Sequence, residues 1–173
     1  GRPLREWHIG FNFTPNYSLD HHGYMNVGYS IICLSNLAML YFNFRERGQR
    51  LPEALSLHVD DLWRTVKNFF FNDGRRIGGD TRARYTYCQC YALPALWLAA
   101  ECLRDADAVR LRTRYLELLL REQECNCDGS FYGERLRGIR EQSTYYYTRL
   151  ESDPALVLSQ ELRWRRFAAL PEP

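Results

Sequence analysis

Three polar loops, each with an Asp close to a Gly, recur along this chain at nearly equal intervals. Asp20, Asp73 and Asp128 lie 53 and 55 residues apart, and each interval holds two apolar segments of helical character. Because one pair of helices cannot bury its apolar faces alone, such a repeat predicts helical hairpins that stack on their neighbours. The spacing therefore predicts an all-α fold of about three hairpins, with the loops at one rim. The length of 173 residues suits a single domain over 1–173.

Turn and capping residues bound the first two predicted helices. An apolar run covers about 26–47 and ends at Gly48, since glycine commonly follows a helix C-terminus. Pro52 suits a first helical turn, where no N–H donor is needed, so it predicts a second helix over about 52–71. Together these two segments form the first predicted hairpin.

Three further helices are predicted from the same signals. One covers about 82–103, and Pro94 inside it is expected to introduce a kink. The next begins with an Asp cap and covers 105–124. A long loop over 125–143 separates it from a last helix over about 154–167.

Composition excludes some partners and favours others. The net charge is only +2, so the chain lacks a field that would attract nucleic acid or a membrane surface. Lys67 is the one lysine, and arginine, which carries nearly all the positive charge, pairs well with carboxylates. The 12 Tyr and 4 Trp are typical of sugar-binding clefts and also of protein cores. An acidic ligand is therefore compatible with the composition.

No segment predicts export or membrane insertion. Residues 1–7 lack the apolar core of a signal peptide. The chain begins without Met, as expected for a mature product or a fragment. The longest apolar stretch, 27–44, is interrupted by Ser and Asn, so we interpret it as a buried helix and not as a membrane span.

The six cysteines do not predict a metal centre. Cys33 and Cys102 lie in apolar helical segments and are expected in the core. The others form two Cys-x-Cys pairs, at 88/90 and 125/127. Zinc sites usually place two to four residues between such ligands, so we predict no metal and no cofactor.

The stretch 12–26 has the most unusual composition in the chain. It contains two His, three Asn, two Tyr and an Asp just before a predicted helix start. Binding and catalytic residues concentrate in loops of this kind. The structural alternative is that Asp20 or Asn26 caps the helix while the other side chains are solvated or packed.

Part of this stretch resembles a known family. Residues 16–23 read Asn-Tyr-Ser-Leu-Asp-His-His-Gly, and Tyr24 and Tyr29 follow. The pattern resembles a Ser-, His-Gly- and Tyr-containing segment of heparinase II/III-like and chondroitin/alginate-type polysaccharide lyases. The later run over 128–133, Asp-Gly-Ser-Phe-Tyr-Gly, is similar to loops of carbohydrate enzymes built as toroids of helical hairpins. The resemblance implies an (α/α) toroid, of which about three hairpins are roughly half, so that self-association or further domains would complete the cleft.

The resemblance also implies a chemistry, β-elimination on an acidic polysaccharide or oligosaccharide that contains uronate. It assigns the catalytic roles to His22 and to Tyr24 or Tyr29, which would move protons. An amide or an Arg would neutralise the substrate carboxylate as charge develops beside it. The residues expected to bind substrate are Asn16, His21, Asn26, Arg82, Arg84, Tyr85 and Tyr132. A secreted or periplasmic location is also implied.

Two other functions remain open. A glycoside hydrolase with the same architecture needs two carboxylates roughly 5–10 Å apart. Its candidates are Asp20, Asp80, Asp128 and Glu134. The other is a non-catalytic helical-repeat module that binds a glycan or a protein. A lyase predicts a His–Tyr contact beside an Arg, a hydrolase predicts opposed carboxylates, and a module predicts loop residues without mutual hydrogen bonds.

Overall fold

The computed structural model describes residues 12–21, 23–76, 89–142 and 144–166, together with Pro3, Glu6 and Ala168. These residues form a mainly helical structure with one small β-hairpin, so the predicted all-α class is confirmed. The elements in chain order are β1 (Asp20–His21), β2 (Tyr24–Met25), α1 (Val27–Glu46), the 3-10 helix η2 (Glu53–Leu55), α2 (Val59–Lys67), α4 (Ala92–Cys102), α5 (Ala106–Glu124), the 3-10 helix η3 (Gly133–Leu136), α6 (Arg137–Gln142) and α7 (Thr144–Trp164).

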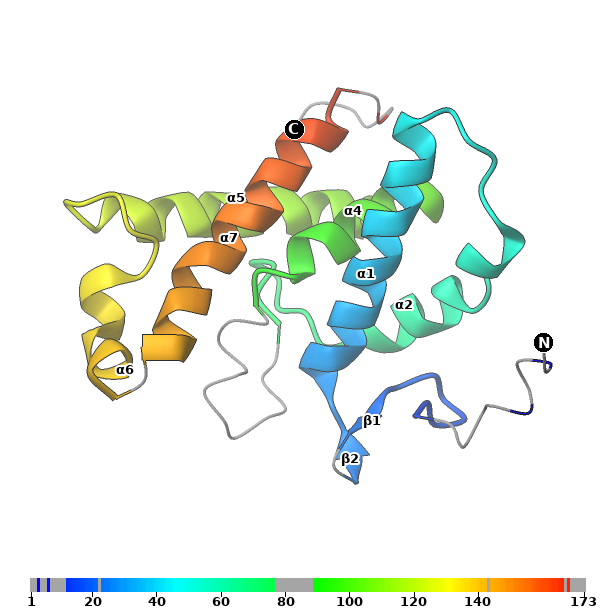
Figure 1. The fold of residues 1–173 in the computed structure, drawn as a ribbon, viewed down its shortest axis with the longest axis horizontal. Helices are drawn as coiled ribbons and strands as arrows, with labels where there is room; N and C mark the ends of the chain where they lie inside the picture. Colours follow the sequence, from blue (N-terminus) through cyan, green and yellow to red (C-terminus); the bar gives the residue numbers. More distant parts are fainter. Residues whose placement is uncertain are drawn as a thin grey trace.

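Helices α1 and α4 form the centre of the molecule (Figure 1). α4 packs against α1 and leads through a short turn into α5, which packs against α4 in turn. Figure 1 shows α2 and α7 on opposite sides of α1. The last helix, α7, returns to contact α4, so helices that are far apart in sequence share one core.

Three aromatic rings join the central helices. Phe42 of α1 stacks on Trp164 of α7 with ring centroids 4.3 Å apart, and it meets Trp97 of α4 edge-on at 5.9 Å. All three rings are buried. Stacked and edge-on arrangements suit the ring quadrupoles, so these contacts add to the stabilisation from buried area. These rings therefore join α1, α4 and α7 within one part of the core.

Both ends of α1 follow the sequence prediction. The Asn26 side-chain oxygen accepts a hydrogen bond from the backbone N–H of Tyr29 at 2.9 Å, which is a helix N-cap. Gly48 follows the helix with a φ of 62°, in the left-handed region that a helix terminus needs. The cap places the β1–β2 hairpin immediately before the first turn of α1.

The structure differs from the predicted helix over 52–71. Pro52 precedes only the short helix η2, and the Ser56 hydroxyl donates to the Glu53 carbonyl oxygen where η2 ends. His58 then has a φ of 58°, a left-handed conformation that does not continue a right-handed helix. The second helix therefore begins only at Val59.

The predicted kink at Pro94 is also wrong for the described part of this segment. α4 begins at Ala92, so Pro94 lies in its first turn, where the missing N–H has no helical partner to lose. The earlier part of the predicted helix, over 82–88, lies outside the described residues.

The predicted loop over 125–143 contains two short helices, η3 and α6, and α7 begins at Thr144 instead of Pro154. Pro154 therefore lies inside α7, where it removes one helical hydrogen bond. Leu150 and Val157 are buried on either side of it. Packing of these side chains outweighs the local preference of proline.

The hairpin pairs predicted from the repeat are present for the first two intervals, since α1 contacts α2 and α4 contacts α5. The third interval differs, because α6 is short and α7 crosses back to α4. The arrangement of hairpins as part of a toroid remains a prediction.

Among the described helices, α1 alone has the length and apolar composition of a membrane span. Of its most apolar window, 44% is buried within the molecule, as in the core helix of a globular domain.

Candidate functional site

The β1–β2 hairpin brings predicted site residues to the start of α1. His21 of β1 is paired with Tyr24 of β2, and directly opposed residues of an antiparallel pair project to the same face. The Asp20 carboxylate accepts a hydrogen bond from the Gly23 N–H at 3.1 Å, and Gly23 has a φ of 81°. Asp20 therefore stabilises the turn that keeps His21 and Tyr24 opposed.

The His21 ring lies against the ring of Tyr29 in the first turn of α1. Their centroids are 4.5 Å apart and the planes meet at 63°, an edge-on contact. Tyr24 is 39% exposed, so the hairpin presents one phenol to solvent beside the His–Tyr pair. The adjacent His22 lies outside the described residues.

The two predicted asparagines have structural roles. Asn26 caps α1 and is only 2% exposed. The Asn16 side-chain oxygen accepts from the Ser18 hydroxyl at 2.8 Å and also contacts the Thr14 hydroxyl, which holds the turn over 14–18. Both side-chain oxygens are thus occupied by neighbouring groups, and the Asn26 side chain is buried, so the proposed site leaves out both residues.

The third loop is fixed by two residues that the sequence did not single out. The Asn126 amide donates to the carbonyl oxygens of Ser130 and Phe131 at 3.1 and 3.2 Å. The Glu151 carboxylate of α7 accepts from three successive N–H groups, those of residues 131–133, at 2.6 to 3.2 Å. A carboxylate bound by several backbone N–H groups is a strong anchor. It fixes the position of Tyr132.

Tyr132 and Tyr29 meet around one buried side chain. Both pack against Leu150 of α7, together with Leu136. Tyr132 also lies close enough to Tyr115, a buried residue of α5, to raise the pKa of its phenol. The start of α1 and the third loop therefore both contact α7, and the gathering of the three loops at one rim remains a prediction.

The second loop reaches the same region through Arg76. This side chain is buried and its positive charge acts on the Tyr115 phenol. The Arg76 N–H donates to the Gln89 side-chain oxygen at 3.4 Å, so the residues on either side of 77–88 lie together. Four residues predicted from this loop, Asp80, Arg82, Arg84 and Tyr85, lie outside the described residues.

A further group comes from α4 and α7. Arg149 donates twice to the Asp153 carboxylate, at 3.2 and 3.0 Å, and hydrogen-bonds to Tyr91. The sequence did not predict this group, because the residues become neighbours only when α7 packs on α4. We call the combined set the tyrosine–arginine cluster: Tyr29, Tyr91, Tyr115, Tyr132, Arg76 and Arg149.

Burial determines which members of the cluster can take part in acid–base chemistry. Burial raises the pKa of Tyr115 well above its ordinary value, and the nearby Tyr132 raises it further. Burial and the Asp153 charge also raise the pKa of Tyr91. These two phenols therefore stay protonated and act as hydrogen-bonding groups. Around the cluster, Tyr24 is exposed, and His21, Tyr29 and Tyr132 are partly exposed, so these four side chains keep contact with solvent.

Asp20 and Asp128, the described carboxylates that a hydrolase would use, form hydrogen bonds within their own loops. Asp20 accepts from Gly23, and the Asp128 carboxylate accepts from the Ser130 hydroxyl and N–H at 2.7 and 3.0 Å. The described residues include no group of three or more His, Cys, Asp or Glu arranged to hold a metal ion. Cys125 and Cys127 are exposed free thiols.

Comparison of the chain with protein-family models, curated proteins and solved structures found no match.

Proposed function

We propose that this chain is a polysaccharide lyase-type enzyme that cleaves an acidic, uronate-containing glycan by β-elimination. The observation that supports this proposal most directly is the His21–Tyr29 ring contact at 4.5 Å beside the exposed Tyr24. Tyr29 packs against Leu150, as does Tyr132, while Arg76 acts on Tyr115 and Arg149 on Tyr91 in the tyrosine–arginine cluster. The hairpin thus supplies proton-transfer groups, and the cluster supplies positive charge.

The chemistry needs a base, an acid and a neutralising group. The base removes the proton from C5 of the uronate, and the electron pair forms a double bond between C4 and C5. The bond from C4 to the glycosidic oxygen breaks, and that oxygen takes a proton from the acid. We assign proton transfer to His22 with Tyr24 or Tyr29. His21 positions Tyr29 through its ring contact.

The substrate carboxylate must be neutralised while charge develops at C5. Arg149 is suited to this part because its side chain is partly exposed at the edge of the cluster, although it also pairs with Asp153. Arg82 and Arg84 are further candidates, because Arg76 and Gln89, on either side of 77–88, lie beside the cluster. Arginine suits the role, since its planar guanidinium binds a carboxylate through two parallel hydrogen bonds.

The hydrogen bonds of the described carboxylates favour elimination over hydrolysis. A hydrolase requires one carboxylate to act as acid and another as base or nucleophile. Asp20 and Asp128 instead accept hydrogen bonds within their own turns. The shared packing of Tyr29 and Tyr132 against Leu150, and the closeness of Tyr132 to Tyr115, also differ from the separated loop residues expected of a binding module.

The test is to incubate the full chain with alginate, chondroitin, hyaluronate, heparan and pectate, and to follow the ultraviolet absorbance of the unsaturated uronate product. We expect one polymer to give a rising signal. His22→Ala should abolish it, and Tyr29→Phe should lower it at least about 100-fold if Tyr29 transfers the proton. Comparison of the activities of Tyr24→Phe and Tyr29→Phe shows which of the two phenols transfers the proton.

Tyr41→Phe is the matched control, because Tyr41 lies farther along α1, near Arg45 and away from the hairpin. It removes a phenol hydroxyl without touching the site, so activity should be unchanged. No unsaturated product from any polymer, with circular dichroism confirming a folded helical chain, would overturn the proposal. Release of reducing ends without the unsaturated product would indicate a hydrolase.

A further inference from the structure

Two exposed cysteines lie one residue apart where α5 ends. Cys125 directly follows the last residue of the helix, with a φ of −71° and a ψ of −13°, and Cys127 lies in the turn that follows. Both thiols are free, and they form the second Cys-x-Cys pair of the sequence. The turn lies at the end of α5 away from α4 (Figure 1). Neither the core nor the proposed elimination reaction uses these two thiols.

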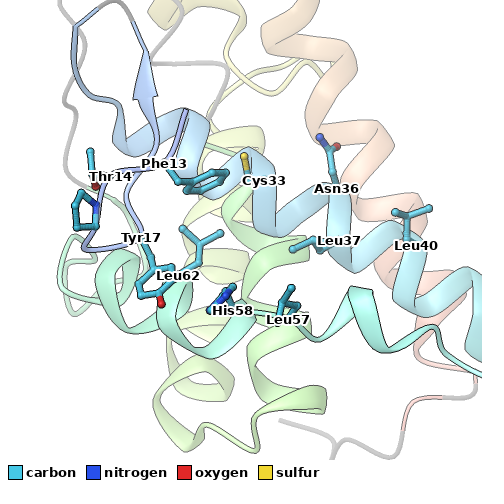
Figure 2. A pocket seen from close by; sticks show the side chains of 11 residues that line it. Phe13, Thr14, Tyr17, Cys33, Asn36, Leu37, Leu40, Leu57, His58 and Leu62 are labelled. Atoms are coloured by element: carbon cyan, nitrogen blue, oxygen red, sulfur yellow. The ribbon is translucent and has the colours of Figure 1, made fainter. Parts of the chain in front are cut away.

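The other described thiols are less accessible. Cys90 is buried, and partial burial raises the pKa of Cys33 and of Cys102. Figure 2 shows Cys33 on α1, in the wall of an apolar groove that Phe13 and Leu37 also line. Because the thiolate is the reactive form of cysteine, these thiols are poor nucleophiles. Among the described cysteines, the pair after α5 is therefore the one that a soluble thiol reagent reaches.

The spacing of the pair permits a bond between its two sulfur atoms. Two residues of chain span at most about 7 Å, and disulfides usually join Cα atoms about 4.4–6.8 Å apart. The chain itself thus keeps the two cysteines within reach of each other. A disulfide across one intervening residue closes a small ring, so its formation changes the backbone at that residue. Exposed disulfides are commonly those that are easily reduced again.

The residue between the two thiols holds the third loop. The Asn126 amide donates to the carbonyl oxygens of Glu122, Ser130 and Phe131, at 2.9, 3.1 and 3.2 Å. There is little free space around it, since a Cβ added at Gly133 would lie 2.9 Å from the Asn126 side-chain oxygen. A change of the backbone at Asn126 would therefore move its amide away from these carbonyl groups. The oxidation state of the pair is thereby coupled to the third loop.

We propose that Cys125 and Cys127 form a reversible disulfide, and that its formation loosens the third loop. The oxidant is a small disulfide of the glutathione class. One protein thiolate attacks a sulfur of this disulfide, the bond between its two sulfur atoms breaks, and one glutathione leaves as a thiolate that takes up a proton. The second protein thiolate then displaces the other glutathione from the mixed disulfide. The protein loses two hydrogen atoms, and one glutathione disulfide becomes two glutathione thiols.

The experiment equilibrates the full chain with glutathione and glutathione disulfide at several ratios, alkylates the free thiols, and maps the tryptic peptides by mass spectrometry. Trypsin cleaves after arginine, so residues 122–135 form one peptide that contains both thiols of the pair and no other cysteine. In oxidising mixtures we expect this peptide to lose two hydrogens and to resist alkylation. Dithiothreitol should return it to the dithiol.

Variants of the pair distinguish an internal disulfide from other thiol chemistry. Cys125→Ser and Cys127→Ser should each retain one bound glutathione, because no second thiol displaces it. Cys33→Ser is the matched control, since it removes a described thiol outside the pair and should leave the behaviour of the peptide unchanged. Circular dichroism verifies that each variant is folded.

Hydrogen exchange measures the coupling to the loop. The Ser130 N–H donates to the Asp128 carboxylate, and we expect it to exchange at least about fivefold faster in the oxidised chain. In Asn126→Ala the amide contacts are already absent, so oxidation should change this rate by less than about twofold. Neither measurement uses a glycan, so its outcome is independent of the proposed elimination reaction.

Three results of the mass measurement would overturn the proposal. These are a peptide that stays a dithiol at every ratio, a wild type that stops at the glutathione adduct, and a disulfide that joins two chains. An equal exchange rate at Ser130 in the oxidised and reduced chains would contradict the coupling between the pair and the third loop.

Discussion

At the scale of single residues, two buried charges face each other in the core. Arg112 is only 2% exposed, lies over the Trp97 ring at 4.3 Å, and has its Nε atom 3.5 Å from a Glu161 carboxylate oxygen. Removal of one partner leaves the other charge buried, which costs far more than loss of a surface pair. The pair therefore constrains how α5 and α7 pack.

Arg112→Met is expected to lower the free energy of unfolding by about 1–3 kcal/mol, because Glu161 loses its buried partner and keeps only the partly exposed Arg165, 3.0 Å away. The measurement is urea denaturation followed by circular dichroism. Arg110→Met is the matched control, since Arg110 forms an exposed pair with Asp107 and should change stability by less than about 1 kcal/mol. Equal effects of the two substitutions would show that burial of Arg112 is unimportant.

Asp105 makes stability depend on pH. Although partial burial opposes its ionisation, hydrogen bonds from Lys67 and Trp63 lower the pKa of Asp105 below its ordinary value. Its carboxylate also caps α5 through the Ala108 N–H at 3.1 Å. A lowered pKa stabilises the fold above the unfolded-state pKa, and this contribution is lost as pH falls through the folded-state value.

We therefore expect wild type to lose unfolding free energy as the pH falls below about 4, the ordinary range of an aspartate. Asp105→Asn retains a capping side chain but removes the charge, so its free energy of unfolding at neutral pH should be lower by about 1–2 kcal/mol. Its free energy of unfolding should also change less than that of wild type as the pH falls below this range. Urea titrations at several pH values measure both. Parallel pH profiles for the two proteins would contradict this explanation.

Individual polar residues explain why the candidate site was only partly predictable. The stretch 12–26 pairs His21 with Tyr24 and places His21 against Tyr29 of α1. Asn26 and Asn16 belong to the same stretch, yet they bind backbone and neighbouring hydroxyl groups. Sequence alone does not distinguish a capping amide from a binding amide, because both occur just before a helix start.

At the scale of elements, the helix boundaries followed the capping residues more reliably than they followed proline. Asp105 caps α5 as predicted, and Asn26 caps α1, which was the structural alternative to its predicted role in substrate binding. Pro52, Pro94 and Pro154 each led to a wrong boundary or kink, because a proline is compatible with a 3-10 turn, a first helical turn or a packed helix interior. Long-range packing decides among these environments, and a local pattern does not contain that information.

The third loop depends on α7 for its conformation. Glu151→Gln should loosen the segment 131–133, because a neutral amide oxygen is a weaker acceptor for three N–H groups than a carboxylate. We expect faster hydrogen exchange at these amides, and a lower rate of the proposed elimination reaction, without unfolding. Glu122→Gln on α5 provides a control for loss of one charge. Unchanged exchange at residues 131–133 would show that Asn126 alone holds the loop.

At the scale of the whole molecule, the aromatic contact among Phe42, Trp97 and Trp164 determines whether the chain unfolds as one unit. The contact joins α1, α4 and α7, and its members lie far apart in sequence. The hairpin repeat predicted contacts between neighbouring segments, but it did not predict that the last helix would return to the first. That return also brings Leu150 between Tyr29 and Tyr132.

Trp164→Ala tests this dependence. Removal of a buried Trp leaves a cavity between three helices, so the free energy of unfolding should fall by about 3–5 kcal/mol. If the core is one cooperative unit, helix content and the fluorescence of the remaining tryptophans will be lost in a single coincident transition. Leu120→Ala, which truncates an exposed side chain on α5, should change stability by less than about 0.5 kcal/mol. Two separate transitions would instead mean that α7 detaches while α1, α4 and α5 remain folded, and the third loop would then lose its anchor before the core does.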